Sequence, residues 1–508
     1  MILKESHRVI RVRSIGLWAA GVVVVWGIAG CASDAQRHAF DDWRRIEHEV
    51  YGGRDSVDTP PAAAFTDEIH RRGDAAGSDA MGDTADLTGY LRHAALHNPG
   101  LEAAFNDWKA ALERIPQARG LPDPRLNYRH FIENVETRVG PQRQAVGVSQ
   151  MFPWFGKLEL RGDVALEAAR AAQARYEARK LRLFYDVKRA YYEYYYLARA
   201  IAVVQENREL VGYLEGVVRT RFKVAAAQHS DVIRAQVELG KLDDQQRSLE
   251  DLRGALAADL NAALNRPIDT PVSWPKSIPQ VIGTLDGEAL RGSLCVANPE
   301  LQALQYEMAK HRTGVSLARK RYYPDVTAVV DYIGTGKRTG AARPSNSGQD
   351  VITAGFSINL PIWRDRYEAG VRESLARFGA ATRTRTERQN MLAAALKTGI
   401  YHYEDAVRKI DLFRDTLVPK AQQALKTSEA SFRTGQSTFF DVIDAQRVML
   451  QFQLSYERAL TDGATRLAQI EMLVGGPVRP RTMSRANDPA DRTQYTQNNK
   501  DGSDTDAK

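Results

Sequence analysis

Long helices and short alternating segments dominate the hydrophobic pattern of this 508-residue chain. From Trp154 to Arg266 there is no proline, and strong helix formers such as Ala, Leu, Glu and Arg prevail. The one break is at Lys223–Ser230, where Ser230 is a good N-cap for a second helix. The pattern predicts a helix over 154–222, about 100 Å long, and a return helix over 230–265 of about 55 Å.

A shorter helical pattern precedes this tract, over Leu87–Arg119, and would add about 50 Å. The two shorter helices, stacked end to end, therefore match the long helix in length. This match predicts an antiparallel pair of columns about 100 Å tall, with strands at one end and a tight turn at the other.

Strand-like segments alternate between apolar residues and small or polar residues. The alternation is clear over Asp325–Tyr332 and Val351–Leu360, and weaker over Leu126–Ile132 and Gln144–Gln150. It is typical of membrane-barrel strands that face lipid on one side and water on the other. A half-buried hairpin of a soluble protein has the same period, so the pattern alone leaves both interpretations open.

These patterns occur twice, in the same order. The matched segments are Asn98–Ala103 with Asn298–Ala303, Pro124 with Pro324, Ser149–Pro153 with Ser357–Pro361, and Asp231–Gln236 with Asp441–Gln446. They predict a tandem duplication, with one repeat over 87–270, a linker over 271–285 and a second repeat over 286–476. The second repeat has its helix break at Thr434–Thr438, where Gly435 suits a left-handed C-cap.

The N-terminus has the pattern of a bacterial secretory signal. Basic residues reach to Arg13, an apolar stretch covers Ser14–Ile28, and Ile-Ala-Gly-Cys ends at Cys31. This ending resembles a lipobox, which implies a signal peptide over 1–30 and a lipid on the Cys31 sulfur. An ordinary signal with a chance cysteine is the other interpretation. We expect 31–86 to be a lipid-anchored tether and 477–508 a disordered tail.

Composition and charge restrict the function further. The formal net charge is +7, but no Lys/Arg-rich run is interleaved with aromatic residues, so we expect no nucleic-acid partner. With Cys31 lipidated, Cys295 is the one remaining thiol, which forms no internal disulfide and no cysteine metal site. Gly334–Lys337 is too compressed for a phosphate loop, and no catalytic constellation can be assembled. We therefore expect no enzyme, no metal site and no cofactor beyond the covalent lipid.

Four strands are too few to close a barrel, and open sheet edges are not tolerated in lipid. The chain must therefore associate if its strands lie in a membrane. Three copies would contribute twelve strands.

The lipobox at Cys31, the two Asn-Pro-x-Leu segments, the string Gln150–Lys157 and the segment Asp441–Gln446 together resemble the TolC family of outer-membrane factors. Within that family they resemble the lipoprotein branch of CusC-like and OprM-like channels. The resemblance covers Leu87–Gly476. It implies a mainly α fold with a small transmembrane β part, in which each repeat combines long antiparallel helices with a β-hairpin. It also implies a trimeric 12-stranded β-barrel continued by a periplasmic α-helical barrel.

The resemblance also implies a function. The chain would be a homotrimeric outer-membrane channel, the passive export conduit of a tripartite efflux system. Its partners would be a periplasmic adaptor and an inner-membrane pump of the RND type. The string Phe-Pro-Trp-Phe-Gly-Lys at 152–157 favours heavy-metal cations as cargo. A periplasmic coiled-coil scaffold lipoprotein without a pore is the alternative, but it has no use for the alternating strands.

Site residues follow from the same resemblance. Asp441 and Asp444 match the acidic pair that surrounds the periplasmic constriction, so three copies would form a cation-binding ring. In the other interpretation Asp441 caps the returning helix and Asp444 is a solvated first-turn residue. The first repeat has Arg234 where the second has Asp444.

Adaptor docking is implied at both helical tips, at Val224, Ala225 and Ala226 and at Thr434, Gly435 and Gln436. The first tip departs from the family pattern because Ala225 replaces a glycine. Phe432 and Ser437 occupy the positions of a Tyr and an Arg that close the gate of the best-known relative, so the sequence leaves the gate-closing network open.

Overall fold

The computed structural model describes residues 86–340 and 343–481, so the expected signal peptide, Cys31, the tether and residues 482–508 lie outside the described residues. The described chain divides into two compact units. The sheet unit comprises 106–173 and 303–384, and the helical unit comprises 86–105, 174–302 and 385–481. Each unit therefore takes residues from both predicted repeats.

The two halves of the chain contain strands and helices in the same order. The first half consists of α4 (Leu87–His97), α5 (Pro99–Arg119), β1 (Arg125–Thr137), β2 (Gly140–Phe152), α6 (Lys157–Lys223) and α7 (His229–Ala263). The second half consists of α8 (Gly287–Ala297), α9 (Pro299–Lys320), β3 (Val326–Thr335), β4 (Val351–Ile358), α10 (Arg364–Leu412), the π-helical η2 (Phe413–Leu417), α11 (Val418–Thr434) and α12 (Phe439–Val474). Among the described residues, no helix has both the length and the apolar character needed to cross a bilayer.

The prediction of one continuous opening helix in each repeat is wrong. Both helices are broken before a proline, because the residue that precedes proline avoids the helical conformation. Asn98 and Asn298 have ψ values of 118° and 119° at these breaks. Each asparagine then caps the next helix, since its Oδ1 accepts from the backbone N–H of the residue three positions later at 3.0 Å.

The same two asparagines connect each opening helix to the end of a return helix. Asn98 Nδ2 donates to the carbonyl of Ala263 at 3.1 Å, and Asn298 Nδ2 donates to that of Leu473 at 2.8 Å. The start of α5 therefore adjoins the end of α7, and the start of α9 adjoins the end of α12. This local arrangement is the one that end-to-end stacking of the two shorter helices requires.

Two helix starts and one turn inside a helical tract differ from the prediction. The N-cap of α7 is Gln228 and not Ser230, because the Asp231 carboxylate accepts from the backbone N–H of Gln228 at 3.3 Å. The long helix α6 begins at Lys157 and not at Trp154, because Gly156 turns the chain with φ +80°. The second long tract contains a π turn directly before Pro419, which has no N–H to continue the α-helical ladder.

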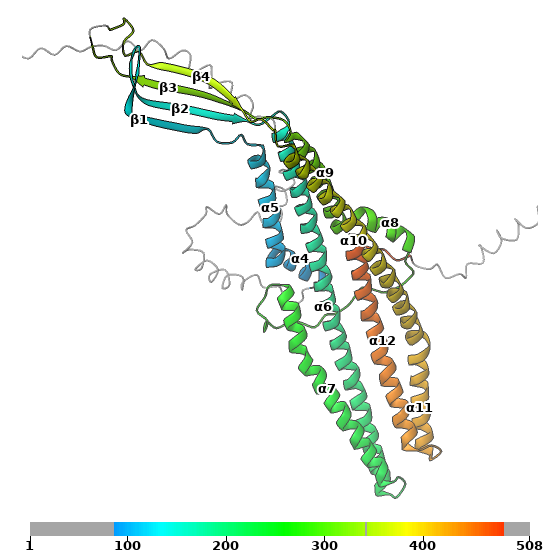
Figure 1. Cartoon of the computed structure of the whole chain (residues 1–508). Helices are drawn as coiled ribbons and strands as arrows, with labels where there is room; N and C mark the ends of the chain where they lie inside the picture. The colour runs from blue at the N-terminus through cyan, green and yellow to red at the C-terminus, as the bar shows by residue number, and fades with distance from the viewer. Residues whose placement is uncertain (1–85, 341–342, 482–508) are drawn as a thin grey trace, which may run out of the picture. The chain divides into compact units, whose positions relative to one another are not determined.

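Four antiparallel strands form one sheet in the order β1-β2-β3-β4 (Figure 1). The predicted strands are confirmed, and those of the first repeat extend beyond the segments that alternate. The register places even-numbered residues on one face. This apolar face carries Leu126, Tyr128, Val146, Val148, Val330, Tyr332, Ile352, Phe356 and Ile358, all exposed. The opposite face, called the polar face, carries Arg125, Asn127, Arg129, Gly147, Ser149, Asp331, Thr353, Gly355 and Ser357, together with the apolar Ala145, Met151, Val329, Ile333 and Val351.

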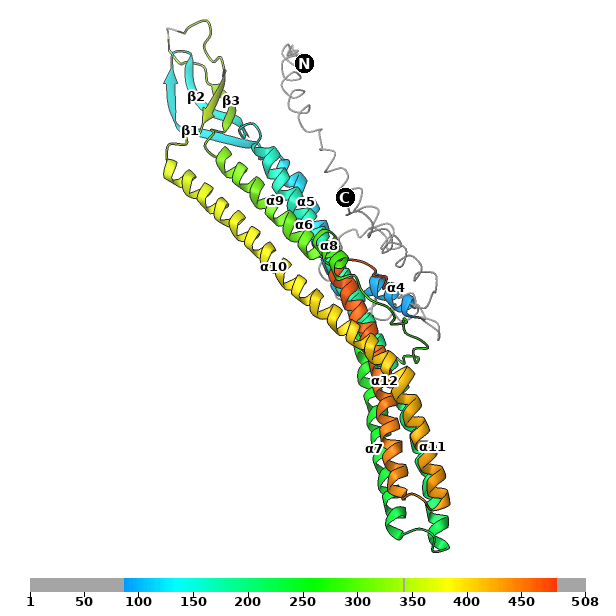
Figure 2. The same ribbon diagram turned by 90° about the vertical axis from the view of Figure 1, so that its right-hand side faces the viewer.

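In the helical unit two helical hairpins share one core. The pair α6 and α7 lies beside the pair α11 and α12 in both views (Figures 1 and 2). Buried residues of all four helices meet there, among them Val211, Val232, Leu425, Phe439 and Ile443. This core holds the two hairpin tips next to each other.

The tyrosine cluster at 191–196 lies on α6. Tyr191, Tyr192 and Tyr194 are buried, and the Tyr194 hydroxyl donates to the carbonyl of Val272 at 2.9 Å. Burial raises the pKa of Tyr192, so the hydroxyl of this residue stays neutral in the core.

Candidate functional site

The tip between α6 and α7 is an exposed left-handed turn. Val224, Ala225 and Ala226 are all exposed. Ala225 has φ +56°, and the N–H of Ala226 donates to the carbonyl of Arg221 at 2.8 Å. This bond closes the helix end in the manner of a Schellman motif, for which glycine is the usual left-handed residue.

The tip between α11 and α12 has the same geometry. Gly435 has φ +80°, as the sequence predicts, and the N–H of Gln436 donates to the carbonyl of Ser431 at 2.8 Å. Thr434, Gly435 and Gln436 are exposed. The two tips therefore present the same short turn to solvent, although one contains Ala and the other Gly.

Asp441 caps α12. Its Oδ2 accepts from the N–H of Thr438 at 2.9 Å and from the Thr438 hydroxyl at 2.8 Å, and Thr438 Oγ1 in turn accepts from the N–H of Asp441 at 3.4 Å. The hydrogen bonds from Thr438 lower the pKa of this fully exposed carboxyl. Within a single chain, Asp441 therefore has the hydrogen bonds of a helix cap.

Asp444 lies one turn further along α12 and is exposed. Its negative charge helps to raise the pKa of Arg447, after the larger effect of the hydrogen bond that Arg447 donates to Glu238 on α7. The Glu238 side chain is only 6% exposed. Asp444 therefore lies beside an ion pair that joins the two hairpins, and its own carboxylate faces solvent.

Arg221 is a tip residue that the sequence analysis did not select. Its guanidinium lies 4.8 Å from the ring centroid of Phe432 and donates to the carbonyls of Phe432 and Arg433 at the end of α11. A basic residue in the last turn of a helix is a known signal for interaction with carbonyl groups at a helix end, and it could have identified Arg221. Here the carbonyls belong to the neighbouring hairpin.

Phe432 and Ser437 have local structural roles. Phe432 is buried against Phe439, with ring centroids 5.5 Å apart, and Ser437 Oγ donates to the carbonyl of Ser428 at 3.3 Å. The Ser437 hydroxyl thus bonds within its own hairpin, whereas the ring of Phe432 contacts Arg221 of the α6–α7 hairpin. Arginines make contacts between the two hairpins near their tips. They include Arg221, Arg234, whose guanidinium lies 5.5 Å from the ring centroid of Phe440, and Arg433, whose guanidinium donates to the Tyr213 hydroxyl at 2.9 Å.

The polar face of the sheet carries an ion pair that joins the edge strand β1 to β3 across β2. Arg129 on β1 lies 3.9 Å from Asp331 on β3. The Asp331 side chain crosses above Gly147 on β2, where a Cβ atom would stand 1.9 Å from Asp331 Oδ1. Glycine at 147 therefore makes room for this pair.

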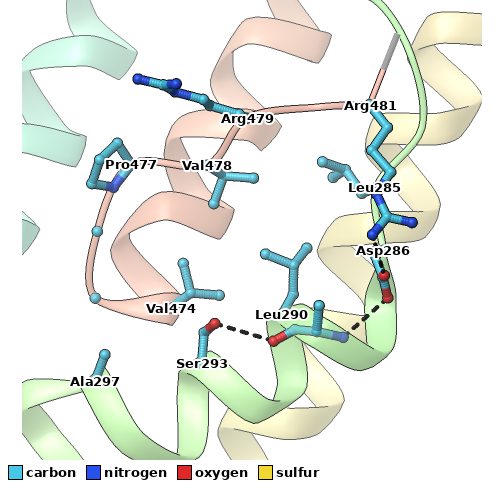
Figure 3. Close-up of a pocket in the computed structure, with 13 residues that line it drawn as sticks. Leu285, Asp286, Leu290, Ser293, Ala297, Val474, Pro477, Val478, Arg479 and Arg481 are labelled. Atoms are coloured by element: carbon cyan, nitrogen blue, oxygen red, sulfur yellow. Dashed lines mark hydrogen bonds and ion pairs between the residues drawn. The ribbon is translucent and has the colours of Figure 1, made fainter. Parts of the chain in front are cut away.

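A cavity of about 380 Å³ in the helical unit lies between α8 and the segment after α12 (Figure 3). Its walls include Leu285, Leu290 and Val474. Asp286 faces it but is engaged by Arg481 at 3.2 Å and by the N–H of Ala289 at 3.0 Å. Apolar and charged side chains thus line this cavity, and the Asp286 carboxylate in it is already engaged.

No cluster of three or more His, Cys, Asp or Glu residues that could hold a metal occurs within 86–340 and 343–481. Cys295 is a free, exposed thiol, and its sulfur lies 3.7 Å from Gln389 Nε2. The predicted lipid attachment at Cys31 lies outside the described residues.

Comparison with known proteins identifies similar chains. A family model described as "Outer membrane efflux protein" matches residues 90–266 and 290–476. The cobalt-zinc-cadmium resistance protein CzcC of Cupriavidus metallidurans is 22% identical over 395 residues, which is 77% of this chain and 90% of CzcC. The outer membrane protein TolC of Vibrio cholerae is 22% identical over 320 residues, 62% of this chain and 72% of that protein.

Solved structures share the fold. The outer membrane protein VceC of Vibrio cholerae aligns with a TM-score of 0.65 and 19% identity over 77% of this chain and 97% of VceC. CusC aligns with a TM-score of 0.66 and 12% identity over 78% of this chain and 96% of CusC. The mainly helical fold with a small sheet is thus that of the TolC-like channels.

Proposed function

Because the chain belongs to the outer membrane efflux protein family, whose model spans both halves of it, we propose that it is the outer-membrane export channel of a tripartite efflux system. The channel itself is passive. It is a homotrimer that receives cargo from an inner-membrane pump of the RND type through a periplasmic adaptor. This function needs no catalytic residue, because the pump supplies the energy.

One observation carries this proposal: a single chain exposes a continuous apolar sheet face and leaves both sheet edges open. Within the described residues, β1 and β4 each pair on one side only. Phe356 is 78% exposed and Leu126 is 73% exposed on the apolar face. Lipid would cover this face, and strands of neighbouring protomers would form hydrogen bonds with the unpaired backbone groups of β1 and β4. Three chains then give a closed barrel of twelve strands, with the polar face toward the pore.

The helical tips supply the periplasmic functions. We assign adaptor docking to the exposed turns at 224–226 and 434–436, which have the same backbone geometry. We assign the constriction to Asp441 and Asp444, whose carboxylates would form a ring of six charges in a trimer. The capping role of Asp441 is compatible with this assignment, because a cap fixes the carboxylate at the tip.

The remaining assignments concern the anchor and the cargo. We propose that Cys31 carries the lipid that holds the mature N-terminus in the outer membrane. The name of CzcC associates that relative with cobalt, zinc and cadmium. With the acidic ring, this likeness favours divalent metal cations as the cargo of this chain.

The decisive experiment is purification from the outer-membrane fraction followed by mass measurement and planar-bilayer recording. We expect trimers that resist dissociation in detergent and conduct ions. A monomer that high salt releases without detergent, and that forms no channel, would instead identify a scaffold lipoprotein. Cys31→Ser should abolish labelling by a radioactive fatty acid in cells, whereas Cys295→Ser should leave it intact.

The gate assignment has its own test. Asp441→Ala combined with Asp444→Ala should raise the conductance or weaken the cation preference of purified trimers in bilayers. An unchanged conductance and cation preference would remove both residues from the constriction. Asp231→Ala is the matched control, because Asp231 caps α7 at the other tip in the same way.

A further inference from the structure

A second charged site lies in the sheet unit, where the strands meet the helices. A cavity of about 160 Å³ opens there, and we call it the basic pocket. Its lining includes Lys157, Arg161, Arg321, Asp325, Asn359 and Tyr367. Three cations and one carboxylate therefore face one small space.

The carboxylate in this pocket is already engaged. Lys157 is buried, and its Nζ donates to Asp325 Oδ1 at 2.7 Å and to the carbonyl of Tyr323 at 2.8 Å. The same Asp325 oxygen accepts from the N–H of Trp154 at 2.8 Å. Lys157 and Asp325 thus neutralise each other and form the floor of the pocket.

The two arginines have no such partner. Arg161 and Arg321 are exposed, and neither forms an ion pair with a carboxylate anywhere in the described chain. Arg161 lies one turn after Lys157 on α6, and the guanidinium of Arg321 lies against α10, with Nη1 3.9 Å from where a Cβ of Gly370 would be. Each basic pocket therefore carries a net charge of two positive units.

The pocket opens on the polar face of the sheet. Val326 pairs with Ile358, and both residues lie on the apolar face of the sheet. Asp325 and Asn359 are the next residues outward, joined by a hydrogen bond from the Asn359 N–H to the Asp325 carbonyl at 3.4 Å. Because side chains alternate along a strand, Asp325 and Asn359 point to the opposite face, which also carries Asp331 and Ser357.

We infer that the basic pocket is a binding site for tetrahedral oxyanions, such as phosphate, on the wall of the pore. This inference rests on the proposed function, which turns the polar face toward the pore. Guanidinium groups match the geometry of phosphate oxygens through paired N–H donors, and Asn359 and Tyr367 add neutral donors. Three copies place six unpaired arginines around the same pore, so the site also sets the ionic preference of the sheet unit independently of the acidic tips.

The first test measures binding of inorganic phosphate to the full-length trimer in detergent by calorimetry. Arg161→Gln combined with Arg321→Gln should weaken phosphate binding at least tenfold. Lys157 is left unchanged because its ion pair is buried. Arg312→Gln combined with Arg383→Gln is the matched control, since it removes two exposed arginines of the same unit outside the pocket. Absence of phosphate binding by the wild type, or an equal loss in the control variant, would overturn the inference.

Bilayer recording separates this inference from the proposed function. Millimolar phosphate should reduce the current through the wild-type channel and leave that through the Arg161→Gln/Arg321→Gln channel unchanged. A protein that forms no channel contradicts the proposed function itself. A conducting channel on which phosphate acts equally with and without the two arginines contradicts only the oxyanion site.

A competition experiment distinguishes a free anion from a lipid headgroup. Glycerol 3-phosphate should displace inorganic phosphate as well as short-chain phosphatidylglycerol does, because a pocket on the pore wall has no place for acyl chains. Displacement by the lipid at a tenfold lower concentration would show that the pocket faces the bilayer. That result would overturn its assignment to the pore.

Discussion

At the scale of single residues, the two tips hold the same turn with different left-handed residues, and this difference predicts a stability effect. Ala225 at φ +56° bears a cost of about 1 kcal/mol that Gly435 does not. We expect Ala225→Gly to slow hydrogen exchange of the Ala226 amide about fivefold. Gly435→Ala should speed exchange of the Gln436 amide by a similar factor, because a Cβ there meets no atom within 4 Å and only the backbone resists. Exchange that is unchanged in both variants would contradict the strain at Ala225.

Asp441 carries a second prediction, because its cap depends on charge. Its pKa is lowered in the folded protein, so its stabilisation is present above the ordinary carboxyl pKa and is lost as the pH falls through the lowered value. After correction for the intrinsic pH dependence of hydrogen exchange, the backbone amides in the first turn of α12 should therefore exchange at a constant rate near neutral pH. The turn should fray only below about pH 4. Asp441→Asn should produce the frayed state already at neutral pH. Asp444→Asn, which removes an equal charge without a capping bond, should not.

At the scale of helices and strands, the helix breaks at Asn98 and Asn298 predict how the opening and return helices hold together. Asn298 is 3% exposed and both caps α9 and bonds the end of α12. Asn298→Ala should cost about 2–3 kcal/mol, from the lost cap and the unpaired Leu473 carbonyl. Asn298→Ser restores a capping oxygen but not the longer bond, so it should recover about 1 kcal/mol. Hydrogen exchange of peptides covering α9 and the end of α12 measures both effects. Equal losses in the two variants would contradict the capping bond, and an Asn298→Ser variant as stable as the wild type would contradict the bond to Leu473.

The elements show which parts of the fold the sequence could predict. Gly435 and the strand pairs were predictable because a left-handed cap and a period of two are local signals. The full lengths of β1 and β2 could not be predicted. Backbone hydrogen bonds to a neighbouring strand hold the outer halves of these strands, and such bonds do not depend on the type of side chain. The π turn before Pro419 was also missed, because proline is compatible with several helix distortions. Tertiary contacts decide which of these forms.

At the scale of the whole molecule, the sequence predicted more of the architecture than of the site. Repeated motifs and alternating hairpins were enough to predict a mainly helical fold with a small sheet, and the family match confirms the resemblance. Arg221 and the basic pocket could not be predicted in the same way. Arg161 and Arg321 are 160 residues apart in sequence. They meet because α6 follows β2 and α9 precedes β3, and β2 and β3 are adjacent antiparallel strands.

The orientation of the sheet gives the final prediction, which compares two adjacent residues of β4. Phe356 lies on the apolar face opposite Ala328, and Ser357 lies on the polar face opposite Thr327. If the apolar face contacts lipid, Phe356→Arg places a charge in the bilayer at a cost of about 2–4 kcal/mol per chain, whereas Ser357→Arg places the same charge in water. We expect Phe356→Arg to reduce severalfold the amount of detergent-resistant trimer in the outer membrane and Ser357→Arg to leave it near the wild-type level. Loss of the trimer in the Ser357→Arg protein alone would reverse the assignment of the two faces, and the pore would then lack both its polar wall and its oxyanion site.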